Sequence, residues 1–367
     1  MIGQNTRLIV GNLFEYRDLG AIELKGFSEP VQAYQIKCSG RASSPLCPPT
    51  FRVCGVGKKR EVLSALNEMT ILTIRHVTVY RYRVPVGFGA HRVMFRPRDG
   101  YDQKVLDETL TIVPEPTQVR WLHDVFGNFV AVASFDARAD ELSIASNIRL
   151  EHTPSNLPDL QIEPEATAYP ISYSEDELPD LLPFMTRRYP DPDNALERWV
   201  RRFLRRGRSN ETGALLMTLT AAIKDSFVYM RRSEQGVQEP GLTLRLGHGS
   251  CRDLALLMVE AVRALGFAAR FVSGYLYVPV RDDPDIRGGG ATHAWCQVYL
   301  PGAGWVEFDP TNGIVGNRDL IRVAVARDPR QAMPLTGTWY GRAEASLGMS
   351  VEVIVRRADE VGTGASS

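Results

Sequence analysis

The chain has 367 residues, more than one hydrophobic core usually serves, so its length predicts two or three domains. Apolar residues make up 44% and charged residues 23%, which excludes collagen-like, mucin-like and wholly disordered chains. The 43 basic residues balance the 43 acidic ones, so no global field would draw the protein to nucleic acid or to an anionic membrane. We therefore expect a folded protein whose partners are chosen by local features.

Charge interrupts every apolar run well before the roughly 20 residues that cross a bilayer. The first ten residues lack the basic, apolar and small-residue pattern of a secretory signal. The five cysteines are few and odd in number, unlike a secreted disulfide scaffold. These features predict no membrane span, reduced thiols and a cytoplasmic location.

Residues 1–38 contain two strand-like stretches, Leu8–Val10 and Ala33–Ile36. The phrase FEYRDLGAIELKGFSEPVQAYQI resembles the C-terminal end of a class III nucleotide cyclase domain, in which an R-D-L-G turn and an L-K-G-F-x-x-P-V segment form the closing strands. The metal-binding and nucleotide-binding residues of that family lie upstream of this segment and are absent here. The resemblance therefore implies a remnant without cyclase activity, and a small β-hairpin packed on the rest is the alternative.

Residues 39–69 lose periodicity and mix Ser, Pro and Gly with a basic cluster, which is typical of a linker. From residue 70 to 153 the pattern becomes short alternating runs, with Thr78, Tyr80, Tyr82 and Val84 expected on one face of a strand. Turn signals follow at residues 85–89, 98–101, 115–117 and 127–128. This spacing predicts an antiparallel β-sandwich module with structural histidines, which could also bind a protein partner.

Residues 154–200 are rich in Pro and acidic residues, and we expect a connecting region with short helical turns. Helical spacing of apolar residues follows at 196–204 and 215–223, and the segment SFVYMRR has the pattern of a strand.

The first chemically informative motif is GHGSCRDLALLMVEAVRALGF. Ser250 is an expected N-cap and Gly266 an expected stop, so Cys251 falls in the first turn of a buried helix. Unpaired N–H groups and the helix dipole favour a thiolate at such a position. Arg252 would add to this effect, whereas Asp253 would oppose it unless its side chain caps or pairs. A lone cysteine is nevertheless also a common small core residue.

A second motif, ATHAWCQVYLPGAGWVEFDPTNG, supplies the other groups that thiol catalysis needs. A cysteine nucleophile requires a base, and that base requires an acceptor that orients it. His293 opens one predicted strand and Asp309 ends the next. A three-residue loop at 301–303 would place Asp309 opposite Trp295 and diagonal to His293, with backbones about 7 to 8 Å apart.

This set of residues is similar to the transglutaminase-like superfamily, a branch of papain-like thiol enzymes, and specifically to bacterial transglutaminase-like cysteine proteases with an N-terminal β domain. The resemblance implies an α+β fold in which a core at residues 201–345 follows the β-sandwich at 70–153, with a final strand and tail at 346–367. It also implies that Cys251 is the nucleophile, His293 the general base and acid, and Asp309 the orienting carboxylate. No cofactor is implied.

Several neighbouring residues allow more than one interpretation. His248, Cys251, His293 and Cys296 have the composition of a zinc site, but His293 and Cys296 should face opposite sides of a strand, which makes Cys296 a core residue. His248 could line a cleft or face solvent. Trp295 could shield the His–Asp pair or only fill the core. The loop 280–290 could be a lid or an exposed connection, and the backbone N–H of Cys251 is an expected oxyanion donor whose companion is unidentified.

The sequence therefore predicts cysteine-dependent acyl transfer on a peptide or protein amide through a thioester, with hydrolysis favoured. Protein-glutamine cross-linking is the alternative within the same chemistry. Two other classes stay open: an inactive scaffold that binds a partner through its β module, and a regulatory protein whose residues 1–38 dock to a nucleotide cyclase.

Overall fold

The structure is a computed structural model of the chain. It describes the following residues: 2–3, 15–22, 31–37, 69–153, 160–205, 207–232, 236–278 and 290–359. Within these residues no helix is both long and apolar enough to span a membrane.

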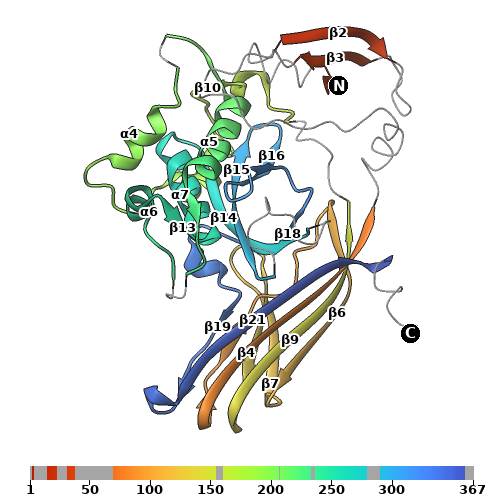
Figure 1. Ribbon diagram of the computed structural model, residues 1–367, viewed down its shortest axis with the longest axis vertical. Coiled ribbons are helices and arrows are strands. Elements are labelled where there is room, and N and C mark those ends of the chain that lie inside the picture. The colour runs from red at the N-terminus through yellow and green to blue at the C-terminus, as the bar shows by residue number, and fades with distance from the viewer. Residues whose placement is uncertain are drawn as a thin grey trace.

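Residues 70–153, called here the β module, form a two-sheet sandwich (Figure 1). Its strands are β4 (Thr70–Phe88), β5 (His91–Val93), β6 (Gln103–Val113), β7 (Gln118–His123), β8 (Phe129–Ser134) and β9 (Arg138–His152). One sheet has the order β20-β4-β9-β6 and the other β19-β5-β8-β7, where β19 is Leu335–Thr336 and β20 is Trp339–Tyr340. Apolar side chains from both sheets share one buried cluster, so the predicted antiparallel sandwich is present.

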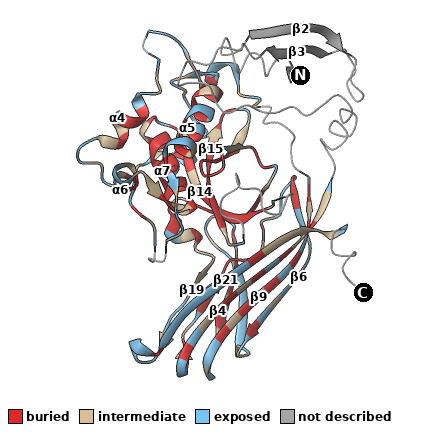
Figure 2. Ribbon diagram, in the orientation of Figure 1, coloured by how far each residue is buried: buried red, intermediate tan, exposed pale blue. Residues whose placement is uncertain are grey.

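Burial alternates along β4, as a half-buried strand requires (Figure 2). Thr78 and Tyr82 are buried as expected, but Val84 is 56% exposed. The reason is a register shift against β9 between Arg81 and Val86, which takes Val84 out of the buried face. The turn expected at residues 85–89 is also wrong in position, because β4 continues to Phe88.

The end of the chain returns to the β module. The strands are β19 (Leu335–Thr336), β20 (Trp339–Tyr340) and β21 (Ser346–Arg357). β19 pairs with β5, and β20 and β21 both pair with β4. The final strand is longer than the stretch Ser350–Val355 that has the pattern of a strand, and it completes a sheet that begins almost 280 residues earlier.

The remaining part of the described chain is a five-stranded antiparallel sheet, called here the core sheet, with helices packed beside it (Figure 1). Its order is β17 (Ile314–Val315), β16 (Gly304–Asp309), β15 (His293–Leu300), β14 (Ala269–Leu276) and β18 (Leu320–Ala326). The helices are α3 (Leu178–Met185), α4 (Ala195–Arg201), α5 (Thr212–Ser226), α6 (Pro240–Leu246) and α7 (Cys251–Ala264). Four short strands complete this part: β10 (Ala168–Tyr169), β11 (Asn210–Glu211), β12 (Val228–Tyr229) and β13 (His248–Gly249). The α+β class is confirmed.

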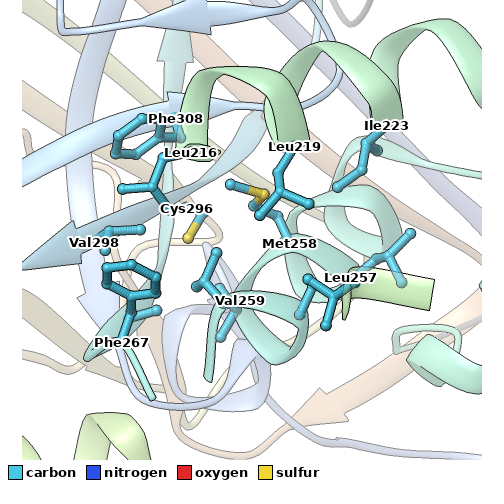
Figure 3. Packing of buried hydrophobic residues seen from close by; sticks show 14 of the residues in the cluster. Leu216, Leu219, Ile223, Leu257, Met258, Val259, Phe267, Cys296, Val298 and Phe308 are labelled. Carbon is cyan, nitrogen blue, oxygen red and sulfur yellow. The ribbon is translucent and has the colours of Figure 1, made fainter. Parts of the chain in front are cut away.

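Helix α7 is the centre of the larger core and is buried along most of its length. Figure 3 shows its residues Leu257 to Val259 packed with Leu216 and Leu219 of α5 and with Cys296 of β15. Helix α4 contributes to the same cluster, so packing begins inside the segment expected to be only a connection.

The β module and the core sheet share a second buried cluster. A buried ionic contact lies at the same junction, where Arg322 of β18 binds the carboxylates of Asp102 and Glu307. Asp102 also accepts from Asn317, and the side chain of Gln103 bonds the backbone of Arg322 in both directions. The two parts are therefore joined by complementary polar groups as well as by apolar packing.

Near the N-terminus, the backbone of β1 (Ile2–Gly3), β2 (Glu15–Ile22) and β3 (Val31–Lys37) forms an antiparallel sheet of order β1-β3-β2. The predicted strand Ala33–Ile36 lies within β3. The R-D-L-G turn is instead part of β2, with a register shift between Asp18 and Gly20. The stretch Leu8–Val10, and the linker except for Met69, lie outside the described residues.

Candidate functional site

Cys251 is the first residue of α7, as the sequence predicts, and is buried. Helix α6 ends at Gly247 with a left-handed backbone (φ 69°), and two residues of β13 lead into the N-cap Ser250. Gly249 has no room for a side chain, since a Cβ would lie 2.8 Å from that of Asp253. The chain therefore enters α7 along a tightly packed path that fixes the position of the sulfur.

Asp253 takes the capping role that the sequence left open. Its Oδ2 accepts from the backbone N–H and the hydroxyl of Ser250, both at 2.8 Å. Its Oδ1 accepts from Arg232 at 2.8 Å and from the backbone N–H of Gln238 at 2.6 Å. These four donors compensate the charge of the buried carboxylate, which caps the start of the helix and is not left unpaired beside the thiol.

Arg252 is held by partners outside the helix, and its charge interacts with Cys251 as the sequence predicts. Its guanidinium donates to the backbone oxygen of Pro329 at 3.1 Å and lies over the ring of Phe271. Burial lowers the pKa of Arg252, while Cys251 and Asp253 raise it.

His293 and Asp309 meet as the register argument requires. β15 and β16 pair Leu300 with Gly304 and Cys296 with Phe308, which leaves a three-residue loop at 301–303. His293 Nε2 donates to Asp309 Oδ2 at 2.8 Å, and both residues are almost fully buried. The imidazole is thus held by a carboxylate, which fixes the proton on Nε2 and leaves Nδ1 for another partner.

The D-P-T-N-G turn holds the carboxylate in place. Asp309 Oδ1 accepts from the backbone N–H of Thr311 at 2.8 Å, and the backbone oxygen of Asp309 accepts from Gly313 at 2.8 Å. Asn312 Nδ2 donates to Asp309 Oδ2 at 2.9 Å. Asn312 was not singled out from the sequence, although its place three residues after an aspartate is a turn signal that could have found it.

Electrostatics couple Cys251 to this pair. Burial alone would lower the pKa of His293, but the charge and hydrogen bond of Asp309, together with the neighbouring Cys251, raise it to about 10. Burial acts to raise the pKa of Asp309, yet His293, Asn312 and the N–H of Thr311 hold it below the usual value. His293 Nδ1 is buried and has no hydrogen-bond partner within normal geometry. It is the ring nitrogen available to the thiol of Cys251. The site favours an imidazolium beside the sulfur.

Trp295 packs on the imidazole, with ring centroids 6.0 Å apart and an interplanar angle of 28°. It is fully buried in an apolar cluster with Val272, Leu276, Leu320 and Val325. The indole therefore fills the core and also covers His293, which keeps the His–Asp hydrogen bond in a low-dielectric setting.

The four residues of the alternative zinc set do not converge. Cys296 lies in the core formed by α5 and α7, and burial raises its pKa (Figure 3). His248 is a half-buried residue of β13 rather than of a solvent-facing loop, and its Nδ1 has no partner. Among the described residues, no group of three or more His, Cys, Asp or Glu side chains is arranged to hold a metal. The loop 280–290 lies outside the described residues except for Gly290.

Tyr229 is a further residue at this site that the sequence pattern did not reveal. It belongs to β12 and packs against the buried cluster that contains Cys251. The strand predicted for SFVYMRR is present as β12, but a strand pattern does not show that its tyrosine lies near Cys251.

In this α+β fold a cysteine at a helix start lies near a buried His–Asp pair, which are the kinds of groups that cysteine-based catalysis needs. Residues 198–310 match the sequence profile of the Transglutaminase-like superfamily, and residues 72–151 match that of the Bacterial transglutaminase-like N-terminal region. The core of the chain is therefore similar to the transglutaminase-like superfamily, and the β module is similar to the N-terminal region of the bacterial members.

Individual proteins are also similar to this chain. The chain is 28% identical to an uncharacterised protein of Mycobacterium leprae over 77% of its own length and 98% of that protein. It is 29% identical to an uncharacterised protein of Mycobacterium tuberculosis over 77% and 91%. Among solved structures, a candidate cysteine protease from Cytophaga hutchinsonii covers 78% of this chain and 91% of its own, with 20% identity and a TM-score of 0.58. This last likeness supports the fold.

Proposed function

We propose that the protein catalyses cysteine-dependent acyl transfer on amide or peptide bonds and that its usual acyl acceptor is water. Cys251 is the nucleophile, His293 the general base and acid, and Asp309 the carboxylate that orients the imidazole. The observation that carries the proposal is the buried hydrogen bond between His293 and Asp309, with Cys251 raising the pKa of the same imidazole. No cofactor takes part in these steps.

The first half of the reaction forms a thioester. The Cys251 proton resides on His293, and the thiolate attacks the amide carbon while the carbonyl π pair moves to oxygen. Collapse of this intermediate breaks the C–N bond, and His293 gives its proton to the departing amine. Asp309 stays ionised throughout and holds Nε2, so that Nδ1 faces the sulfur.

The second half releases the acyl group. Water or an amine gives a proton to His293 and attacks the thioester, which expels the Cys251 thiolate. Nothing in the described residues forms an evident amine pocket, so water is the proposed acceptor. Cross-linking of protein glutamine is the second candidate, which the superfamily match supports.

The test is mass spectrometry of peptide and glutamine-amide libraries after incubation with the full chain. Hydrolysis predicts new peptide termini or loss of ammonia, whereas cross-linking predicts joined products when an amine is added. Cys251→Ala should abolish either product. Cys296→Ala is the matched control, because this thiol lies in the helical core and should be dispensable for turnover.

Iodoacetamide labelling separates an enzyme from the other proposed classes. An enzyme predicts that iodoacetamide alkylates Cys251 in preference to the other thiols, because the thiolate is the reactive form of a nucleophilic cysteine. Unselective labelling with no product from either library would refute the proposal and favour a scaffold that binds a partner through the β module. Unchanged turnover without residues 1–60 would argue against a regulatory role for the N-terminal strip. The cytoplasmic location stays a prediction.

A further inference from the structure

Tyr229 is placed beside the nucleophile by a short parallel ladder. β12 pairs with β13 so that Tyr229 lies opposite Gly249, two residues before Cys251. The backbone N–H of Met230 donates to the oxygen of Gly249 at 2.9 Å, which fixes this register. The neighbours of Tyr229 in the chain, Val228 and Met230, are 63% and 47% exposed, whereas Tyr229 packs against the cluster that contains Cys251.

The hydroxyl of Tyr229 can donate a hydrogen bond. It shares a hydrogen bond with Arg231, and a guanidinium can only donate, so the phenol oxygen accepts and its own proton is left for another acceptor. Burial raises the pKa of Tyr229, the charge of Cys251 raises it further, and Arg231 opposes both. The phenol therefore keeps its proton at neutral pH, and the guanidinium strengthens it as a donor.

The start of α7 offers a backbone donor at the nucleophile itself. Cys251 is the first residue of α7, so its N–H has no acceptor within the helix. Outside the helix, no backbone oxygen of the described residues accepts from this N–H. One such donor at a helix start is half of an oxyanion hole, and a second donor is usual.

We infer that the hydroxyl of Tyr229 is the second donor, which together with the backbone N–H of Cys251 holds the oxygen of the tetrahedral intermediate. The inference rests on the proposed function and deepens it. When the Cys251 thiolate adds to the carbonyl carbon, the C–O π pair becomes a full charge on oxygen. The Tyr229 proton is shared with that oxygen without being transferred, and it returns to the phenol when the C–N or C–O bond of the leaving group breaks.

The experiment compares two reactions of the same sulfur in Tyr229→Phe. Acylation by p-nitrophenyl acetate passes through an oxyanion, whereas alkylation by iodoacetamide does not. We expect acylation to fall by about 10²-fold, in the range measured for loss of one oxyanion donor. The rate and pH profile of alkylation should stay at the wild-type values. Tyr275→Phe is the matched control, because this hydroxyl lies in the same cluster but donates to the backbone of Phe95.

The outcomes are distinct. Equal acylation of wild type and Tyr229→Phe would overturn the inference and leave the proposed function intact. A parallel fall of acylation and alkylation would also overturn it, since the phenol would then only position the thiol. A wild-type protein that p-nitrophenyl acetate does not acylate, with unselective alkylation, would overturn the proposed function together with the inference.

Discussion

Replacing Asp309 by Asn tests the arrangement of the site most sharply, because it changes one atom. In the native protein Asp309 Oδ1 accepts from the N–H of Thr311, and Oδ2 accepts from His293 and Asn312. An asparagine would keep its oxygen toward Thr311 and turn its NH2 group toward the imidazole. His293 Nε2 would then have to accept, which moves the ring proton to Nδ1 and removes the base that faces Cys251.

The magnitude follows from the pKa of His293, which rises from 6.5 to about 10 mainly because Asp309 outweighs burial. Such a rise corresponds to roughly 5 kcal/mol in favour of the imidazolium. Because the folded pKa lies above the unfolded value, this stabilisation is fully present below about pH 6.5 and is lost as the pH rises through 10. We therefore expect the stability lost in Asp309→Asn to be largest near pH 6 and to shrink toward pH 10.

The assay is thermal unfolding of both proteins from pH 5.5 to 10, combined with p-nitrophenyl acetate acylation at pH 7. Acylation should fall by about 10³- to 10⁴-fold, as when a serine protease loses its orienting carboxylate. Glu141→Gln is the charge-matched control, since it removes a half-exposed carboxylate that pairs with Arg81. A stability difference that does not change with pH, or acylation at the wild-type rate, would refute the assigned roles of the pair.

Two further predictions concern the framework of the site. Gly274→Ala should destabilise the protein by more than about 3 kcal/mol in urea unfolding, because a Cβ there would lie 2.1 Å from a backbone oxygen of β18. Gly241→Ala is the control and should be nearly neutral, because the nearest atom to its Cβ would be the end of the flexible Arg245 side chain at 3.7 Å. Similar losses of stability in the two variants would contradict the packing argument. Asp102→Ala should lower the free energy of unfolding by about 3–5 kcal/mol, because Arg322 loses one of its two carboxylate partners. Adding Arg322→Met should recover part of this loss. An Asp102→Ala variant as stable as the wild type would show that the contact does not stabilise the protein.

The geometry of the site was predictable because each part carries a local signal. The glycine-rich approach and Ser250 indicate a helix that begins at Cys251. The loop length fixes the parity of two strands, and parity decides whether Asp309 can reach His293. These are short-range rules, and no tertiary contact overrides them here.

Other features were missed because they depend on contacts distant in sequence. The ion pair of Asp102 with Arg322 joins residues 220 positions apart, and neither is marked by periodicity or turn composition. The register shift that exposes Val84 follows from how β9 meets β4. A strand is predicted around Tyr229, but the position of this residue opposite Gly249 follows from the pairing of β12 with β13.

The β module is part of what positions the nucleophile. Cys251 and Ala255 of α7 share one buried cluster with Leu72, Ile74 and Val130 of the module. Side chains in such a cluster are packed closely, so a displacement on the module side is transmitted to the helix start. The N-terminal region and the core, which match two family profiles, are also physically connected in this protein. The sandwich completes the apolar surface against which the first turn of α7 packs. The module would therefore be required for thiol chemistry even if it never touches a substrate.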